Sequence, residues 1–302
     1  MIMSVVFSFP GFEIIADRIA AEKNMLRGDV TIRQFPDGES YVRLNSPVGE
    51  QDVIIVCGLD HPDQKIMALM FFIHTAREMG AKTIGLVAPY LGYMRQDKRF
   101  KDGEAVTADI FSAYLSQMID WLITIDPHLH RHKNLNEIYS IPSKVIHAND
   151  LIAEWIKSNI KQPLLIGPDA ESVQWVAEVA KIAHAPFEVL TKVRYGDRDV
   201  TISMPNLEAY RGHTPILIDD IISTASTMIK SASNLRSAGM KPPVCIGVHG
   251  IFAGDAYEKL LSSGIEKVIT SNSTLHKSNG IPIETIIATA VARMMSNLNK
   301  SE

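Results

Sequence analysis

Short apolar, β-branched runs alternate with amphipathic stretches along the whole chain. The runs expected to form strands are SVVFS, VTIRQF, SYVRL, DVIIVCG, TIGLVAPY and WLITID in the first half, and PLLIGPD, PFEVLT, VTISM, PILIDD, PVCIGVHG and KVITSN in the second. Helices are expected near residues 62–80, 105–118, 170–183, 224–238 and 255–262. This alternation is typical of a mainly parallel sheet flanked by helices, so it predicts the α/β class.

The same rhythm occurs twice, which indicates an internal duplication of one α/β unit. A chain of 302 residues is long enough for two domains of ordinary size. We therefore expect a first domain over residues 1–147 and a second over residues 148–302. The last ~18 residues are a candidate for packing back on the first domain.

Charge and cysteine content limit the classes of partner. Thirty Lys and Arg against 34 Asp and Glu give a net charge of −4, which argues against a basic surface for nucleic acid. Cys57 and Cys245 both lie in apolar runs and are expected to be buried thiols in a reducing compartment. With no basic leader and no run of 18 apolar residues, we expect a cytoplasmic protein without a membrane partner.

The segment PILIDDIISTASTMIK carries the strongest chemical signal. A buried run from Pro215 to Ile218 leads into Asp219 and Asp220, then into a loop of small residues and a helix. The loop residues are Ser223, Thr224, Ala225, Ser226 and Thr227. Backbone N–H groups at a helix N-terminus can bind phosphate, and paired carboxylates can accept hydrogen bonds from a sugar diol or hold hydrated Mg²⁺.

The alternative for this loop is that Ser223 or Thr224 simply caps the helix. For a Ser-Thr pair alone, capping would be the simpler interpretation. The adjacent Asp219 and Asp220 favour a ligand site, because two neighbouring carboxylates repel each other unless a cation or ligand is present.

Two polar segments of the first half have both a structural and a functional interpretation. Pro36-Asp37-Gly38 predicts a turn between two strands. The stretch YMRQDKRFK contains Arg95, Lys98, Arg99 and Lys101 after a predicted strand. It is either a solvated surface or an anion-binding segment, since Arg is suited to bidentate phosphate contacts.

Two further segments are similarly ambiguous. His128, His130 and His132 alternate after the run WLITID, and in an extended conformation they would share one face and suit a transition metal. Lys192 and Arg194 begin the polar stretch TKVRYGDRD, which would form an exposed hairpin in the structural interpretation.

Together these segments resemble the ribose-phosphate diphosphokinase family, also called phosphoribosyl pyrophosphate synthetases, which has the phosphoribosyltransferase fold. The resemblance rests on FPDGE at 35–39, PYLGYMRQDKRFKDGEA at 89–105, DPH at 126–128, GPD at 167–169, TKVR at 191–194 and DDIISTAST at 219–227. KRFKDGEA looks most like the archaeal-type branch. The resemblance implies two phosphoribosyltransferase-like domains, the first on the nucleotide side and the second on the ribose-phosphate side.

The resemblance also implies an activity, the Mg²⁺-dependent transfer of the diphosphoryl group of ATP to ribose 5-phosphate for nucleotide biosynthesis. It implies that Lys192 and Arg194 are catalytic and that His128 and Asp169 bind the metal. The implied ATP-binding residues are Phe35, Asp37, Gly38, Glu39, Arg95, Gln96 and Asp97. The residues implied to bind ribose 5-phosphate are Asp219, Asp220 and Ser223 to Thr227. A homo-oligomer, a dimer or dimer-based, with the ATP site near the subunit interface is also implied.

Some residues depart from the family pattern. Ala225 and Ser226 stand where the family usually has two glycines, which adopt positive φ more easily. Glu171 and Ser172 follow the GPD motif in place of the usual small residues, and TSNST at 270–274 only loosely matches the family's segment.

Two other functions stay open at this point. The altered phosphate loop motivates a catalytically silent relative that regulates an active partner. The alternating histidines motivate a metallohydrolase built on His128, His130 and His132. In the family only the first of these histidines has a role, and His130 and His132 are then expected at the surface.

Overall fold

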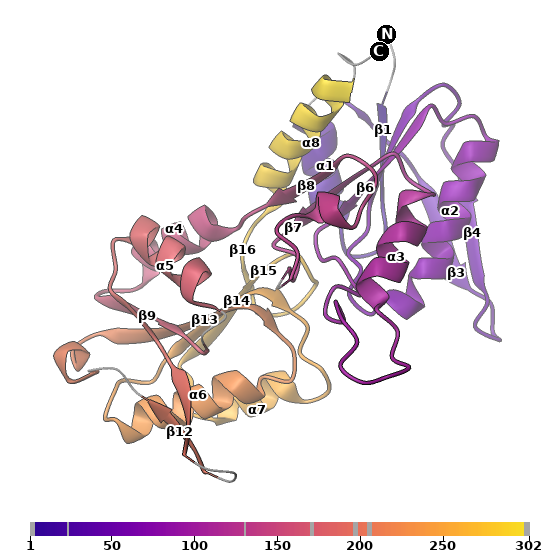
Figure 1. Ribbon diagram of the computed structural model, residues 1–302. Coiled ribbons are helices and arrows are strands. Elements are labelled where there is room, and N and C mark those ends of the chain that lie inside the picture. Colours follow the sequence, from indigo (N-terminus) through magenta and orange to yellow (C-terminus); the bar gives the residue numbers. More distant parts are fainter. Residues whose placement is uncertain are drawn as a thin grey trace. The chain divides into compact units, whose positions relative to one another are not determined.

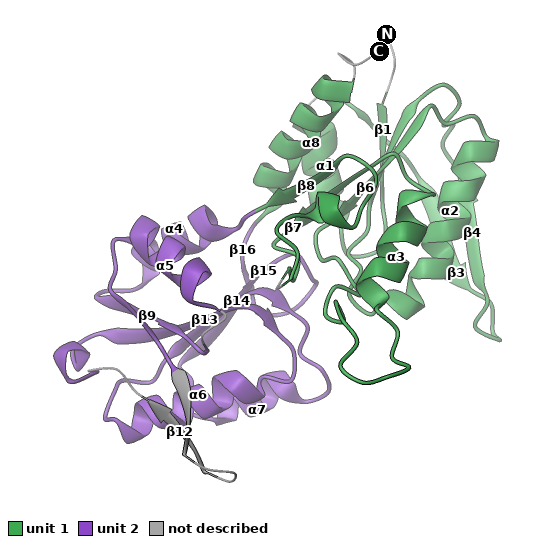
Figure 2. Cartoon of the chain, in the orientation of Figure 1, with its two compact units in different colours: residues 1–146, 283–302 green, residues 147–282 purple. Residues whose placement is uncertain are grey.

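The computed structural model describes residues 4–22, 24–129, 131–169, 172–195, 199–203 and 207–298, without side chains for 191–195 and 199–203. The chain forms two compact units (Figure 2). Unit 1 contains residues 1–146 and 283–302, and unit 2 contains residues 147–282. The sequence predicts a boundary after residue 147 and a return of the last ~18 residues to the first domain; the chain passes between the units at residues 146/147 and again at 282/283.

Unit 1 is built on a six-stranded sheet in which every neighbouring pair is parallel. The strand order is β2 (Leu26–Arg27), β1 (Ser4–Ser8), β5 (Asp52–Val56), β6 (Thr83–Ala88), β7 (Trp121–Ile125) and β8 (Ser143–Ile146). The helices are α1 (Glu13–Glu22), α2 (Ile66–Glu78), α3 (Thr107–Ser116) and α8 (Glu284–Leu298), with 3-10 turns η1 (Pro62–Gln64) and η2 (Leu135–Glu137). An antiparallel hairpin joins β3 (Val30–Gln34) to β4 (Ser40–Leu44) (Figure 1).

Unit 2 has a second six-stranded parallel sheet. Its order is β10 (Phe187–Val189), β9 (Pro163–Gly167), β13 (Thr214–Ile222), β14 (Val244–Gly250), β15 (Lys267–Ser271) and β16 (Asn279–Ile281). The helices are α4 (Asn149–Asn159), α5 (Val173–Ala183), α6 (Ser226–Ser237) and α7 (Ala256–Ser262), with the turn η4 (Leu207–Tyr210). An antiparallel ribbon joins β11 (Thr191–Tyr195) to β12 (Asp199–Ser203). The predicted α/β class with parallel sheets is confirmed.

The two sheets have the same strand order, which is the pattern expected from the predicted duplication. β1, β2, β5, β6, β7 and β8 take the same places as β9, β10, β13, β14, β15 and β16. The hairpin β3–β4 falls at the same point of its half as the ribbon β11–β12. The helix that follows the last strand of each sheet packs in the other unit. Helix α4 follows β8 of unit 1 but packs on α5 in unit 2, and helix α8 follows β16 of unit 2 but packs on α1 in unit 1.

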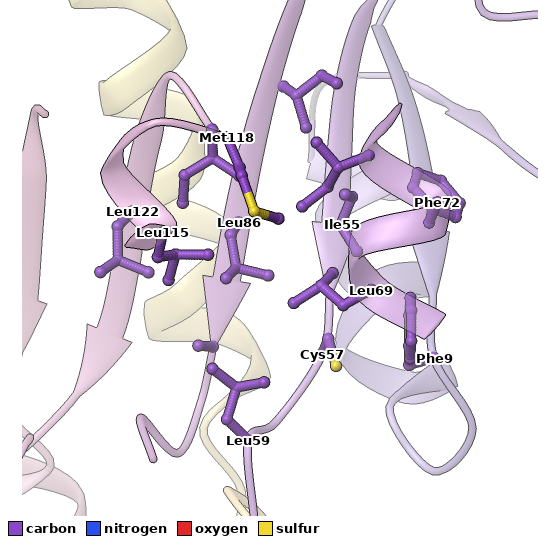
Figure 3. Close-up of a cluster of buried hydrophobic side chains, with 14 of the residues drawn as sticks. Phe9, Ile55, Cys57, Leu59, Leu69, Phe72, Leu86, Leu115, Met118 and Leu122 are labelled. Atoms are coloured by element: carbon purple, nitrogen blue, oxygen red, sulfur yellow. The ribbon is translucent and has the colours of Figure 1, made fainter. Parts of the chain in front are cut away.

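The core of unit 1 shows why these strands read as continuous apolar runs. Ile55 of β5, Leu86 of β6 and Leu122 of β7 lie in one buried cluster with side chains of α2 and α3 (Figure 3). The neighbouring residues Ile54 and Val87, which point to the opposite face, are also fully buried. Both faces of the sheet are therefore covered, as parallel sheets require. Cys57 and Cys245 are free and buried, as expected.

Three helices were not predicted, namely α1, α4 and α8. Each has the signal, because buried residues recur four apart: Ile15 and Ile19 in α1, Ile152 and Ile156 in α4, and Ile287 and Val291 in α8. Strands β2, β8 and β16 span two to four residues and were also missed. Within the described part of the chain, no helix has the length and apolarity needed to cross a membrane.

Candidate active site

The paired acids of unit 2 lie inside a strand, not after its end as predicted. β13 continues to Ile222, since Ile221 and Ile222 pair with His249 and Gly250 of β14. The carboxylates also hold the local backbone: Asp219 Oδ1 accepts a hydrogen bond from the Asp220 N–H at 3.1 Å, and Asp220 Oδ1 accepts one from the Ile221 N–H at 2.7 Å. Pairing with β14 therefore extends the strand past the two acids.

Electrostatics link these acids to the GPD motif of the neighbouring strand. Burial, which is the largest cause, and the charges of Asp220 and Asp169 together raise the pKa of Asp219 to about 8. The charge of Asp169 affects the pKa of Asp219 because Asp169 follows β9, and β9 is hydrogen-bonded to β13, which contains Asp219. Three carboxylates of unit 2 therefore share one edge of the sheet, where a cation or a hydrogen-bonding ligand would relieve their repulsion.

Neither Ser223 nor Thr224 occupies the N-cap position of α6, so the capping alternative is wrong. The N-cap residue is Ala225, which makes no side-chain capping hydrogen bond. Ser226 Oγ instead donates to Thr224 Oγ1 at 3.2 Å. A loop of small residues thus leads directly into the N-terminal N–H groups of α6, which is the arrangement of an anion site at a helix N-terminus.

Ala225 adopts the left-handed conformation that the family's glycine would allow. Its φ is 59° and its ψ is 4°, and its side chain is 5% exposed. An alanine pays a steric cost in this region that glycine does not. The loop therefore keeps the glycine-like backbone, at a cost in strain.

Ser172 closes a turn around Asp169. Its N–H donates to Asp169 Oδ1 at 3.2 Å, and its hydroxyl donates to the Asp169 carbonyl at 2.7 Å. Gly167 makes room for it, because a Cβ at this position would lie 2.4 Å from Ser172 Oγ. Ser172, which departs from the family pattern, thus has a structural role; Ala170 and Glu171 lie outside the described residues.

Lys192 and Arg194 occupy alternate positions of β11. They pair in register with Ile202 and Val200 of β12. The predicted strand PFEVLT is divided between β10 and β11, which begin at Phe187 and Thr191. The side chains of the two cations are not among those described.

In unit 1 the predicted turn at residues 36–38 is confirmed. The Phe35 N–H donates to the Glu39 carbonyl at 2.8 Å, and the Gly38 N–H donates to the Phe35 carbonyl at 2.9 Å. The Glu39 N–H also donates to Asp37 Oδ1 at 3.2 Å. Gly38 has φ 93°, which only glycine adopts easily. The hairpin β3–β4 thus carries Phe35, Asp37 and Glu39 together at its tip.

Two neighbours of Phe35 were missed by the sequence analysis. The Arg33 guanidinium carbon lies 4.6 Å from the centre of the Phe35 ring and 4.1 Å from that of Tyr41. Phe35 and Tyr41 meet edge to face, with centroids 5.9 Å apart. Phe35 is still 40% exposed. The available signal was the two-residue strand period, which puts Arg33 and Phe35 on one face.

Hydrogen bonds hold the segment with Arg95, Gln96 and Asp97 just before its start and at Gln96. Before it, Tyr93 has φ 62°, its hydroxyl donates to Asp63, and its carbonyl accepts from Thr107 Oγ1 at 3.1 Å. Within it, the Gln96 carbonyl accepts from the Ala108 N–H at 3.2 Å.

Asp97 itself faces a cation. Arg131 Nε donates to Asp97 Oδ1 at 3.2 Å, and the side chain of Asp97 is 7% exposed. Arg131 was missed by the sequence analysis, although it lies among the alternating histidines. It joins the predicted ATP segment to the segment that carries His128.

The histidines do not form a group in the part of the chain that is described. His128 follows β7 after Asp126, which has φ 30° and is buried. His132 was expected at the surface, but its side chain is 21% exposed and its Nδ1 lies 3.4 Å from Glu137 Oε2. His130 lies outside the described residues. Among the residues described, no three His, Cys, Asp or Glu side chains are arranged to hold a metal ion.

Comparisons with known proteins agree with these motifs. The model of the N-terminal domain of ribose phosphate pyrophosphokinase matches residues 4–118, and that of the phosphoribosyl transferase domain matches residues 134–285. The chain is 34% identical to a ribose-phosphate pyrophosphokinase of Saccharolobus solfataricus over 79% of this chain and 82% of that protein. It is 31% identical to one of Methanobrevibacter smithii over 91% of this chain and 95% of that protein.

One solved structure has the same fold over nearly the full length. It is the phosphoribosylpyrophosphate synthetase from Mycobacterium smegmatis, at a TM-score of 0.84 and 23% identity, covering 97% of this chain and 99% of that chain. The predicted fold of two phosphoribosyltransferase-like domains is confirmed.

Proposed function

Because the chain belongs to the ribose-phosphate pyrophosphokinase family, we propose that it transfers the diphosphoryl group of ATP to the C1 hydroxyl of ribose 5-phosphate. The products are 5-phosphoribosyl 1-diphosphate and AMP. The observation that carries this proposal is the placement of Asp219 and Asp220 in β13, one short loop before the N-terminus of α6.

This placement suits a sugar phosphate. The 5′-phosphate binds to the N–H groups of the loop Ser223 to Thr227 and of the first turn of α6. The ribose diol then lies at Asp219 and Asp220. Because the pKa of Asp219 is raised, this carboxyl keeps its proton to a higher pH than an ordinary aspartate and can donate a hydrogen bond to the diol.

The transfer is an in-line displacement at the β-phosphorus of ATP. The C1 hydroxyl oxygen forms the new bond to the β-phosphorus and loses its proton. The bond from the β-phosphorus to the oxygen that bridges it to the α-phosphorus breaks, and AMP leaves with that oxygen. Lys192 and Arg194 offset the negative charge that develops on the transferred group, since such catalysis depends on positioning and electrostatics.

Mg²⁺ is the proposed cofactor. When bound, it would offset the negative charge of the phosphate groups. Asp169 offers a carboxylate oxygen of the kind that Mg²⁺ prefers, and the charge repulsion among Asp169, Asp219 and Asp220 favours a cation nearby. We assign His128 and Asp169 to the metal bound with ATP, and Asp219 and Asp220 to the ribose side.

The nucleotide is assigned to residues of unit 1. Phe35 presents an exposed ring that can stack on adenine, beside the carboxylates of Asp37 and Glu39 for the amino group. Arg95 and Gln96 bind the phosphates and base. Asp97 acts through Arg131, whose guanidinium it holds.

We also propose that the chain works in the cytoplasm as a homo-oligomer, at least a dimer, in which the hairpin β3–β4 reaches the ATP of a neighbouring subunit. Size-exclusion chromatography with light scattering, run alongside activity over a range of protein concentrations, tests the oligomer. Full activity of a monomer would contradict it.

The two other functions lose their motivation. The regulatory alternative rested on Ala225 in place of glycine, yet Ala225 has a glycine-like φ of 59°. The metallohydrolase needs the histidines to act as a group, whereas His132 lies beside Glu137. Stoichiometric zinc or iron in the purified protein, lost on His130→Ala, would revive it.

The direct test is AMP release from ATP with ribose 5-phosphate and Mg²⁺. We expect activity in the wild-type protein, and we expect Lys192→Ala to lower kcat by 10² or more while changing KM for either substrate by about threefold or less. The control is Lys161→Ala, an exposed cation of the same unit. No AMP release at saturating substrates would favour the regulatory function, and an unchanged kcat in Lys192→Ala would refute the role of this residue.

A further inference from the structure

Three residues after β14 hold the chain where it enters the proposed phosphate loop. The N–H groups of Ile251 and Phe252 both donate to the Ile222 carbonyl, at 3.0 and 3.1 Å, and the Ala253 N–H donates to the Ser223 carbonyl at 3.1 Å. These bonds lie beyond the last regular pair of β13 and β14, which is Ile222 with Gly250. Residues 251–253 therefore fix the end of β13 and the first residue of the loop.

The middle residue of the three has a strained backbone. Phe252 has φ 42°, in the left-handed region, where a bulky side chain is rarely found. Such a conformation persists only when surrounding contacts hold it. The ring of Phe252 is 7% exposed, so these contacts involve the side chain as well as the backbone.

Two other rings hold Phe252. The imidazole of His276 lies 4.4 Å from the Phe252 ring centre at an interplanar angle of 35°, and Tyr257 meets Phe252 edge to face at 5.1 Å. Tyr257 and His276 also touch, with centroids 4.7 Å apart. We call Phe252, Tyr257 and His276 the three-ring cluster.

The imidazole of this cluster is itself fixed in orientation. His276 Nδ1 accepts a hydrogen bond from the Ser278 N–H at 3.1 Å and lies 2.8 Å from Ser278 Oγ. The backbone N–H of His276 donates to Asn279 Oδ1 at 3.0 Å. Gly250 leaves the space that the Phe252 ring needs, because a Cβ there would lie 2.5 Å from that ring.

We propose that Phe252 is a positioning residue for ribose 5-phosphate. The three-ring cluster holds Phe252 in its left-handed conformation, so that residues 251–253 keep their hydrogen bonds to Ile222 and Ser223 and set the shape of the phosphate loop. This inference rests on the proposed function, which assigns ribose 5-phosphate to that loop.

Two substitutions separate the ring from the backbone it supports. Phe252→Ala deletes the ring but keeps an L residue, whose left-handed conformation then has no support. Phe252→Gly also deletes the ring but adopts a positive φ at little cost. We expect Phe252→Ala to raise KM for ribose 5-phosphate about tenfold, with less than about a twofold change in KM for ATP, and Phe252→Gly to recover most of this loss.

The control is Ile265→Ala, which removes a side chain from the same core cluster at a residue that takes no part in the hydrogen bonds of residues 251–253. It should lower the unfolding temperature but leave both KM values unchanged. Hydrogen exchange gives a second readout: the amides of residues 251–253 should exchange faster in Phe252→Ala and return toward the wild-type rate in Phe252→Gly.

The inference is overturned if Phe252→Ala and Phe252→Gly raise KM for ribose 5-phosphate equally, if neither changes it, or if Ile265→Ala changes it as much. These outcomes require an active wild-type protein. A wild-type protein that neither binds ribose 5-phosphate nor releases AMP refutes the proposed function instead, and the positioning role with it.

Discussion

At the scale of residues, the candidate site is distinguished by side chains held in costly states. Asp219 is half-buried beside two other carboxylates, and Ala225 has a left-handed backbone. Neither state is favourable by itself, so each is stable only because neighbouring elements impose it. The electrostatic cost at Asp219 and the backbone strain at Ala225 can each be measured with a substitution that removes it.

Asp219→Asn tests the electrostatic cost. The pKa of Asp219 is raised in the folded protein, so the folded state binds more protons than the unfolded state between the ordinary value of 3.8 and about 8. Stability without ligands therefore falls as pH rises through this interval. Asp219→Asn should raise the unfolding temperature by a few degrees at pH 8.5 and by less at pH 5, while abolishing AMP release.

The matched control is Asp102→Asn, at an exposed residue of unit 1, which should follow the wild-type pH dependence. Thermal unfolding without Mg²⁺ or substrates makes the comparison. A stability difference that does not change with pH would refute the charge explanation for Asp219.

Ala225→Gly tests the backbone cost. Glycine relieves the strain at φ 59° but adds freedom to the unfolded chain and removes a buried methyl group, so we expect a net gain of about 0.5–1 kcal/mol in the free energy of unfolding. KM for ribose 5-phosphate should stay equal or fall. Urea unfolding and the AMP assay provide both measurements, and a loss of stability would mean that the conformation of the loop is not strained.

At the scale of elements, the two antiparallel hairpins fall at equivalent points of the two halves but are assigned different chemistry. The hairpin β3–β4 carries Phe35, Asp37 and Glu39, and the ribbon β11–β12 carries Lys192 and Arg194. The sequence predicts the turn at 36–38 because Pro, Asp and Gly act locally. It misses the contact of Arg33 with Phe35 and Tyr41, which arises only when two strands pair.

Gly38→Ala tests whether the shape of the first hairpin matters for ATP. A Cβ at Gly38 meets no atom within 4 Å, so the cost of alanine comes from φ 93° alone, about 1–2 kcal/mol of local stability. We expect KM for ATP to rise several-fold with little change in KM for ribose 5-phosphate.

Gly239→Ala is the matched control for the hairpin. Gly239 has φ 75°, and a Cβ there also meets nothing within 4 Å, but it follows α6 in unit 2. It should lower stability without raising KM for ATP. Equal effects of the two substitutions on KM for ATP would refute the role of the hairpin tip.

At the scale of the whole molecule, the two units exchange the helices that follow their last strands, α4 and α8. α8 is the last helix of the chain, yet it packs on α1 and against β7 and β8 in unit 1. α4 follows β8 but packs on α5 and β16 in unit 2. The chain therefore crosses between the units twice, and the stability of unit 1 depends on a segment made after unit 2.

Ile287→Ala tests this dependence. Ile287 is fully buried on α8, and its truncation should lower the free energy of unfolding by about 2–4 kcal/mol. Hydrogen exchange should show the loss in α1, β7 and β8 and not in β13 or β14. Thr285→Ala, at an exposed position of the same helix, should change stability by about 0.5 kcal/mol or less. Faster exchange confined to unit 2 would contradict the assignment of α8.

The sequence by itself determined the α/β class, the turn at residues 36–38 and the family, because apolar periodicity, turn chemistry and motif spacing are local properties of the chain. Only the tertiary structure decided that β13 extends past Asp220, that Arg131 holds Asp97, and that Ala225 and Phe252 are left-handed. These features depend on contacts between residues far apart in the chain. No periodicity records such contacts, since the neighbouring element that imposes each of them is known only once the chain has folded.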